Sequence, residues 1–492
     1  MNGSMLLSFV ILYLTCSIGI GLYAAILVHN TQDFAVAGRR LPLPLVTATV
    51  FATWFGAETV LGISATFVKD GLRAVVADPF GSSLCLILAG LLFARRLYRL
   101  NLLTIGDYYR LRYNRAVEVL CTLCIVASYL GWVSAQIKAL GLVFNIVTDG
   151  AMSQPIGMVT GALIVLTYTT FGGMFSVAIL DFVQITIIMG GMIYIGSVVS
   201  GLAGGVEAVV SHAAAAGKLD FFPPAELESW IPFLGAWITM MFGSIPQQDV
   251  FQRITSARDE QTAVRGSVLG GSLYFFFAFV PMFLAYCATL IDPAQVADLM
   301  DRDSQLVLPT LIVRHTPIVA QIVFFGALLS AIMSCSSATL LAPSVAFSEN
   351  IVKGFMPRIG DRGLLRVMRT VLIGFAAIVL LFALRSEATI FRMVESAYKV
   401  TLVAAFVPLF AGLYWARATT QGALLAIATG LGTWITLELA GAPDAIWPPQ
   451  IVGFLVAAAA MVAGSLLPQI IDRRAEIARV DRPPPLTRSL SD

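Results

Sequence analysis

A dense run of hydroxyl groups stands in the ninth apolar stretch of the chain, where Ser334, Ser336, Ser337 and Thr339 surround Cys335. Hydroxyls in an apolar helix often bond back to a carbonyl of their own helix. That account fits isolated hydroxyls better than four of them within six positions. A hydroxyl pair that faces free backbone carbonyls forms an all-oxygen shell, which suits a hard monovalent cation.

Two apolar stretches are interrupted near their middles, one at Ala52–Thr59 and one at Gly243–Gln248. A helix in lipid must satisfy its own backbone, so a break at membrane depth is tolerated where it lines a cavity or packs against protein. The alternative is that Gly and Pro are simply commoner in membrane helices. The two breaks lie five spans apart, so the two helices enter the membrane from opposite sides, as the halves of an inverted repeat do. We expect a binding site where the breaks meet.

Carboxylates within the apolar stretches are further candidates, because a charge at membrane depth is costly and usually functional. Glu58 lies at the first break, with Thr59 beside it, and Asp249 lies just past the second break. Asp181 lies near the start of the sixth stretch.

Other kinds of chemistry have little support in the sequence. The three histidines lie in or beside connecting segments without metal-binding spacing, and the six cysteines fall inside apolar runs. No GxxxxGK[ST] motif for binding nucleotide phosphates is present. A net charge of +2 gives no reason to expect a nucleic-acid partner. We therefore expect neither an enzyme nor an ATP-driven pump.

The elements that must position these residues are membrane-spanning helices. The chain has 58% hydrophobic and 12% charged residues among 492, and its apolar runs are long enough to cross a hydrocarbon core of about 30 Å. We expect an all-α integral membrane protein with one transmembrane domain at 1–471. Thirteen spans are predicted, at roughly 5–28, 43–68, 77–98, 116–146, 155–174, 177–203, 229–251, 266–291, 317–351, 367–384, 388–415, 419–439 and 448–471.

The connecting segments predict the orientation of these spans, because Lys and Arg concentrate on the cytoplasmic side. With the N-terminus outside, 22 Lys and Arg lie in cytoplasmic segments and six in outer segments. The C-terminus is then cytoplasmic, and 472–492, with its run Pro483–Pro485, is expected to be a short disordered tail.

Several ordered segments between residues 30 and 420 resemble the sodium/solute symporter family, which includes sodium/proline, sodium/sugar and choline transporters. The resemblance implies a LeuT-type fold, with two inverted five-helix repeats at about 43–203 and 229–415, and alternating access driven by an ion gradient. The segments that carry it are Gly38–Leu41 (GRRL), Thr104–Tyr109 (TIGDYY), Gly172–Gly173 with Ser176–Gln184 (SVAILDFVQ), Gly243–Arg253 (GSIPQQDVFQR) and Ala331–Asn350 (AIMSCSSATLLAPSVAFSEN).

The resemblance also implies a sodium site. Its ligands would be the main-chain carbonyls near Ala52, Phe55 and Ala331, with the side chains of Ser334 and Cys335. Ser334 fits the family pattern. Cys335 departs from it, because most relatives that bind sodium have a second hydroxyl there and a thiol is a poor ligand for a hard ion. Two alternatives follow. Either the carbonyls and Ser334 are enough to bind sodium without a second hydroxyl, or protons drive transport instead of sodium.

Asp181 matches a family aspartate near the cytoplasmic route by which sodium leaves. For the solute, Trp54 and Trp132 match positions at which choline carriers hold a quaternary ammonium by cation–π attraction. Gln247 stands where those carriers have another tryptophan.

The three glutamines Gln136, Gln247 and Gln248 could equally bind a carboxylate or an amide. Organic cations such as choline, amino acids and monocarboxylates therefore all remain candidate solutes.

The sequence thus predicts a symporter that carries a small polar organic solute into the cell with sodium, in the plasma membrane, here a bacterial inner membrane. The alternatives are a proton-coupled or sodium-independent transporter of the same fold, and a sensor or channel built on it. A sensor would usually carry an added cytoplasmic domain, and the tail is short.

Overall fold

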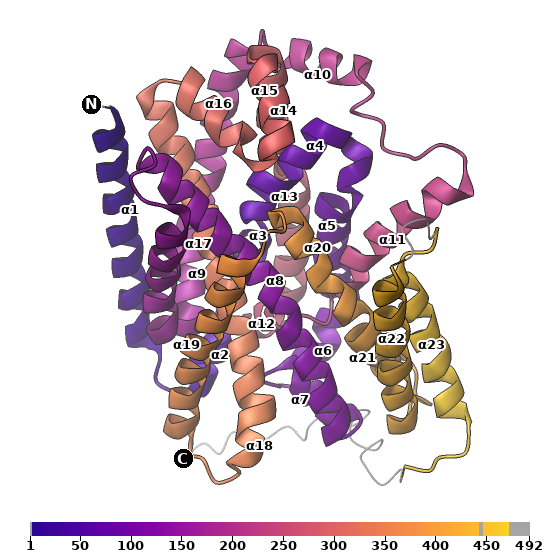
Figure 1. Cartoon of the computed structure of the whole chain (residues 1–492). Helices are drawn as coiled ribbons and strands as arrows, with labels where there is room; N and C mark the ends of the chain where they lie inside the picture. The colour runs from indigo at the N-terminus through magenta and orange to yellow at the C-terminus, as the bar shows by residue number, and fades with distance from the viewer. Residues whose placement is uncertain (1, 442–445, 472–492) are drawn as a thin grey trace.

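The computed structural model describes residues 2–441 and 446–471, and these fold into a bundle of helices (Figure 1). The only β contact among these residues is an isolated bridge between Leu41 and Ala257. The predicted tail at 472–492 lies outside the described residues.

The first half of the described chain contains the helices α1 (Asn2–Ala24), α2 (Thr31–Val36), α3 (Leu43–Trp54), α4 (Ser64–Asp70), α5 (Ser82–Leu88), α6 (Arg95–Arg99), α7 (Ile105–Arg112), α8 (Arg115–Val147), α9 (Gln154–Leu202) and α10 (Val206–Ala215). The second half contains α11 (Leu227–Gly243), α12 (Gln248–Ser256), α13 (Glu260–Phe277), α14 (Phe279–Ile291), α15 (Pro293–Arg302), α16 (Val307–His315), α17 (Ile318–Phe347), α18 (Lys353–Phe355), α19 (Asp361–Arg385), α20 (Ile390–Thr401), α21 (Val407–Tyr414), α22 (Thr420–Ala440) and α23 (Pro449–Leu466).

Short 3-10 and π-helical turns continue or join several of these helices. They are η1 (Ala25–Leu27), η2 (Ala37–Arg39), η3 (Glu58–Ile63), η4 (Leu72–Val75), η5 (Val76–Gly81), η6 (Ala89–Ala94), η7 (Ser304–Leu306), η8 (Ser348–Val352) and η9 (Leu402–Phe406).

Ten helices of the described residues are long and apolar enough to cross a membrane, and a bent pair raises the number to eleven. The sequence predicts thirteen. The difference lies in α9, a single 49-residue element where two spans were expected, and in α11, which has only 17 residues. The count of thirteen therefore stays a prediction.

Both expected breaks are present. α3 ends at Trp54, and the helix resumes at Glu58 with a bend of 52°. α11 ends at Gly243, and α12 begins at Gln248. α3 packs against α9, α12, α13 and α17, so protein rather than lipid surrounds its broken end, as the cost of unsatisfied backbone requires.

α9 turns sharply at Gly173, which has φ 50° and ψ −140°. A side chain rarely adopts this backbone conformation. A Cβ at this position would also meet the main-chain oxygen of Phe34, so the turn needs glycine for two independent reasons.

Hydrogen bonds between side chains join α7, α8 and η8, near the end of the bundle where α7 and α18 lie (Figure 1). Asn350 of η8 accepts a hydrogen bond from Thr104 Oγ1 at 2.7 Å and donates to Asp107 Oδ1 at 2.8 Å and Glu118 Oε1 at 3.0 Å. Burial raises the pKa of Asp107 to about 6, and the neighbouring charge of Glu349 adds to the shift. The network fixes α7 against α8 and against the end of α17.

We expect Gly173→Ala to lower the stability of the protein by about 1–3 kcal/mol, the usual cost of a forced backbone conformation. Thermal unfolding of the purified protein in detergent measures the change.

The matched control is Gly196→Ala in the same helix, where a Cβ meets no atom within 4 Å. This change should alter the stability by less than about 1 kcal/mol. Equal melting temperatures for the two variants would contradict the role assigned to Gly173.

Candidate functional site

The first group of candidate residues lies where α3, α9 and α17 meet. Asp181 of α9 is fully buried and accepts hydrogen bonds from Ser334 Oγ and Thr49 Oγ1, each at 2.5 Å. Ser334 Oγ also lies 3.2 Å from the carbonyl oxygen of Ala52, in the last turn of α3. A carboxylate, two hydroxyls and a main-chain carbonyl thus converge beside the break.

Two further predicted ligands flank this group. Phe55 follows α3 with φ −86° and ψ 79°, which is not helical, so its carbonyl does not continue the α-helical pattern. Ala331 is fully buried one turn before Ser334 in α17.

The hydroxyl run in α17 behaves differently from the expectation. Ser336 and Thr339 donate to the carbonyls of Ile332 and Cys335, and Ser337 donates to the carbonyl of Ser334. Ser336 and Thr339 satisfy their hydroxyls within their own helix. Ser334 contacts α3 and α9, and the Ser337 hydroxyl also contacts Tyr168 of α9. Of the hydroxyls in this run, Ser334 is the one that lies beside the break of α3.

Cys335 faces another neighbour. Its Sγ lies 3.9 Å from Glu58 Oε1. The structure thus places the thiol toward Glu58, on the next position of α17 after Ser334.

Glu58 begins η3 directly after the break and is 2% exposed. It accepts hydrogen bonds from Trp132 Nε1 at 3.1 Å and from Gln136 Nε2 at 2.5 Å. Gln136 also accepts a hydrogen bond from the amide of Ala57 at 2.9 Å, which holds the break against α8. None of the ion pairs formed by the described residues includes Glu58.

Aromatic rings surround this carboxylate. The ring centroids of Trp54 and Trp132 lie 5.4 Å apart, and Tyr398 of α20 lies 5.7 Å from Trp54 and 5.5 Å from Trp132. Tyr129 stacks on Trp132 at 5.9 Å. We call these four residues the aromatic cluster. Sequence analysis found the two tryptophans but missed both tyrosines, for which the only signal was their place in apolar stretches.

Buried polar atoms at the aromatic cluster lack partners. Among the described residues, Trp54 Nε1 and Tyr398 Oη form no hydrogen bond. A polar group left unpaired in a protein interior is costly. These two atoms are therefore available to a polar group of a ligand.

Of the remaining residues predicted to contact the solute, Gln247 and Thr59 lie next to the aromatic cluster and Gln248 does not. Gln247 donates to Ser128 Oγ at 2.9 Å, one residue before Tyr129 in α8. Thr59 Oγ1 lies 3.1 Å from the carbonyl oxygen of Trp54. Gln248 instead accepts from the amide of Ile105 at 2.9 Å, and so joins α12 to α7. The structure does not bring Gln248 to the aromatic cluster.

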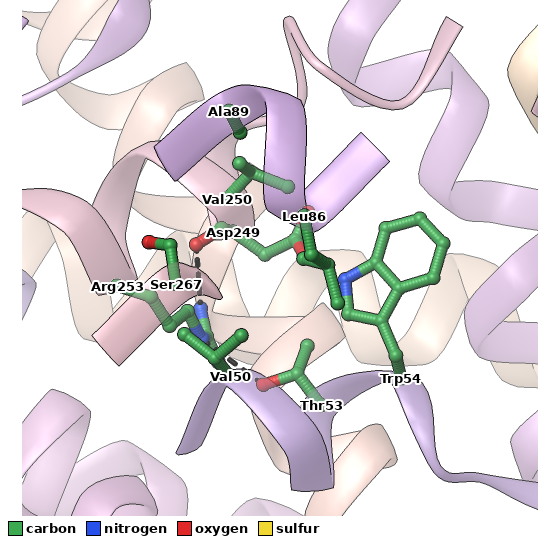
Figure 2. Close-up of a pocket in the computed structure, with 9 residues that line it drawn as sticks. All are labelled: Val50, Thr53, Trp54, Leu86, Ala89, Asp249, Val250, Arg253 and Ser267. Carbon is green, nitrogen blue, oxygen red and sulfur yellow. Dashed lines mark hydrogen bonds between the residues drawn. The ribbon is translucent and has the colours of Figure 1, made fainter. Parts of the chain in front are cut away.

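Figure 2 shows a small cavity beside Trp54, lined by residues of α3, α5, η6, α12 and α13. Its volume of about 10 Å³ has room for roughly one water molecule. Arg253 spans it, donating to Thr53 Oγ1 at 3.0 Å and to the carbonyl of Asp249 at 3.2 Å. Arg253 follows the second break and is one of the 22 Lys and Arg assigned to cytoplasmic segments from the sequence, but its side chain is buried, with 2% exposure.

A larger cavity of about 390 Å³ is lined by residues of α8, η7 and the start of α20. Charged side chains of both signs line it, including Lys138, Asp303 and Glu387. From its wall at Ile390, α20 leads to Tyr398 of the aromatic cluster. The residues of the aromatic cluster are buried and do not line this cavity.

The interior around the breaks holds more acidic than basic groups. Glu58, Asp78, Asp181 and Asp249 are buried there, and Arg253 is the buried guanidinium beside them. Such an excess of carboxylates favours the binding of cations at membrane depth. Clusters of three or more His, Cys, Asp or Glu side chains suited to a metal ion are absent from the described residues.

Comparison with known proteins identifies the class of protein. A family model described as the sodium:solute symporter family matches residues 34–430. The chain belongs to the sodium:solute symporter family. Its family and relatives are transporters, which confirms the expectation that it is an integral membrane transporter and not an enzyme.

Two relatives illustrate the range of the family. The high affinity choline transporter 1 of Homo sapiens is 28% identical over 457 residues, which cover 88% of this chain and 76% of the relative. The osmoregulated proline transporter OpuE of Bacillus subtilis (strain 168) is 26% identical over 496 aligned residues, which cover 94% of each chain.

A solved structure of a Na⁺-coupled sialic acid symporter has the same fold. It superposes with a TM-score of 0.79 at 19% identity and covers 94% of this chain and 97% of that chain. The predicted all-helical, LeuT-type fold is confirmed.

We expect Ser334→Ala to lower the stability by about 1–3 kcal/mol, because it removes a buried hydrogen bond to Asp181 and leaves that carboxylate less satisfied. Ser336→Ala is the matched control, since Ser336 bonds only to Ile332 of its own helix, at 2.6 Å. Thermal unfolding in detergent compares the two variants. Equal losses would show that Ser334 contributes no more than an ordinary helical serine.

Proposed function

We propose that this protein is a secondary active transporter that carries a small organic cation into the cell together with sodium. The observation that carries the proposal is Glu58, a buried carboxylate with no basic partner among the described residues, beside three mutually contacting rings. A cation over an aromatic face gains about 0.5–2 kcal/mol. An ammonium group held there would also neutralise Glu58.

The solute would contact Trp54, Trp132 and Tyr398 through its cationic group. The unpaired Trp54 Nε1 and Tyr398 Oη favour a solute with its own polar group, such as a hydroxyl or carboxylate. Three further polar residues would lie around the bound solute, namely Thr59, Gln136 and Gln247. Gln248 would not contact the solute, because its side chain bonds to Ile105 and joins α12 to α7. The relatives include a choline transporter and a proline transporter, which supports a small solute with a nitrogen centre.

Sodium would bind between Asp181, Ser334 and the carbonyls of Ala52, Phe55 and Ala331. The convergence of four oxygen-bearing groups on the break supports this assignment. Cys335 would lie between the ion and the solute, since its thiol faces Glu58. A proton bound at Asp181 is the alternative, and the experiment below separates the two ions.

Alternating access follows from the two broken helices. We assign the inverted repeats to about 43–203 and 229–415. The supporting feature is that the breaks at Phe55 and at Ser244–Gln247 each interrupt the first span of one repeat. The N-terminus would be outside and the C-terminus cytoplasmic, in a bacterial inner membrane, since the Lys and Arg of the connecting segments are then concentrated on the cytoplasmic side. The 390 Å³ cavity would be the outer vestibule.

Uptake into proteoliposomes tests the proposal. Radiolabelled choline, betaine, proline, lactate and a sugar are offered under an inward sodium gradient, with an inward proton gradient as the paired condition. We expect choline or betaine to accumulate only with sodium. Accumulation driven by protons alone would contradict the sodium assignment, and preferential uptake of lactate or sugar would contradict the cationic solute.

Two variants should separate the ion from the solute. Glu58→Gln should raise the solute concentration for half-maximal uptake about tenfold or more, which corresponds to 1.4 kcal/mol. Ser334→Ala should instead raise the sodium concentration for half-maximal uptake. Glu207→Gln, an exposed carboxylate of α10, is the control that should change neither. Equal effects of Glu58→Gln and Glu207→Gln would remove Glu58 from the solute site.

A further inference from the structure

The proposed function does not use Asp78, a buried carboxylate at the start of the third span. Asp78 lies in η5 and is 3% exposed. Its Oδ1 accepts a hydrogen bond from Tyr274 Oη of α13 at 2.6 Å and another from the hydroxyl of Ser82. Neither partner carries a charge.

A counter-charge for Asp78 is absent from the described residues, since none of their ion pairs includes it. Arg73, the nearest basic residue along the chain, donates to the carbonyl of Phe222 at 3.1 Å. An ionised carboxylate buried without a cation costs several kcal/mol. Asp78 therefore needs a proton or another cation during at least part of the transport cycle.

A chain of hydrogen bonds links Asp78 to the first break. Tyr274 Oη lies 3.0 Å from Thr59 Oγ1, and Thr59 Oγ1 lies 3.1 Å from the carbonyl oxygen of Trp54. Thr59 directly follows Glu58, and Trp54 belongs to the aromatic cluster. Each hydroxyl has one proton, so Thr59 donates to Tyr274 Oη when Tyr274 donates to Asp78. Thr59 is free to donate to the Trp54 carbonyl when Tyr274 donates to Thr59 instead. A proton on Asp78 thus changes which contact Thr59 makes at the end of α3.

The titratable groups on the surrounding elements are few. Tyr274 comes from α13, Glu58 from η3, Cys85 from α5 and Arg73 from η4. The first turns of α13 also carry Glu260, which pairs with Arg95 and Arg99, and Arg265. α11, which packs against η5, contributes Glu228 in its first turn, and that residue is exposed. Asp78 and Glu58 are the two carboxylates that these elements bury.

We propose that Asp78 is a proton-binding site, distinct from the group around Asp181, and that Tyr274 and Thr59 couple its protonation to the conformation of the broken helix. The proton enters from bulk water and returns to it on the other side of the membrane. A metal ion needs a shell of several oxygen ligands. At Asp78 the Tyr274 and Ser82 hydroxyls both donate to one carboxylate oxygen, so the site does not offer such a shell. A single proton bound by the carboxylate neutralises its charge.

Infrared difference spectroscopy tests proton binding independently of transport. Spectra of the lipid-reconstituted protein are recorded between acid and alkaline buffer, for the wild type, Asp78→Asn and Asp298→Asn. Asp298 is an exposed carboxylate of α15 and serves as the control. We expect a protonated-carboxyl band from a buried site in the wild type and in Asp298→Asn, and its loss in Asp78→Asn. An unchanged band in Asp78→Asn would overturn the proposal.

The coupling is tested by uptake, and this part rests on the proposed function. Wild-type uptake under a fixed sodium gradient should change about fivefold or more between acid and alkaline external buffer, within the usual range of coupling between sites. Asp78→Asn and Tyr274→Phe should both flatten this pH profile, and pyranine trapped in the vesicles should no longer report a solute-induced pH change. Tyr274→Phe keeps the ring, so a structural defect alone would lower uptake without flattening the profile.

The two proposals fail in different ways. Absence of sodium-driven solute uptake by the wild type would overturn the proposed function and leave the infrared band as the test of Asp78. Uptake with the same pH profile in the wild type, Asp78→Asn and Tyr274→Phe would overturn the coupling while the proposed function stands.

Discussion

The interruption of the second span creates the constraint on which the rest of the structure depends. Backbone groups freed by a break at membrane depth must find partners within the protein. Ser334 supplies one to the carbonyl of Ala52, Thr59 supplies one to the carbonyl of Trp54, and Gln136 accepts from the amide of Ala57. Three helical segments therefore hold the broken end of α3 through side chains that also belong to the candidate sites.

Under the proposed function, this arrangement would give ion and solute a physical reason to influence each other. Ser334 and Cys335 are consecutive residues of α17, yet one contacts Asp181 and the other faces Glu58. An ion that draws Ser334 and the Ala52 carbonyl together also fixes the segment that carries Trp54 and Glu58. Coupling between the two sites is then a consequence of shared covalent structure, and by thermodynamic linkage it acts in both directions.

The sequence predicted the features that depend on composition and local pattern. Long apolar runs gave the helices, Gly and Pro near the middle of two runs gave the breaks, and the carboxylates at Glu58 and Asp181 stood out because charges are rare there. The features that the sequence did not predict depend on the rotation of each helix about its own axis. Whether Ser336 or Ser334 leaves its own helix, and whether Gln248 reaches the aromatic cluster, depends on how neighbouring helices are rotated. Tyr398, in another span, became visible as a partner of Trp54 only once α3 and α20 were packed together.

Hydrogen exchange at the break of α3 tests the central claim most directly. Amide exchange of the segment 50–62 is measured for the protein in lipid nanodiscs, in sodium chloride and in potassium chloride of equal ionic strength. A cation bound by the Ala52 and Phe55 carbonyls holds this segment closed, so sodium should slow its exchange about tenfold, with no change in α22 and α23. Equal exchange of the segment in the two salts would contradict the account.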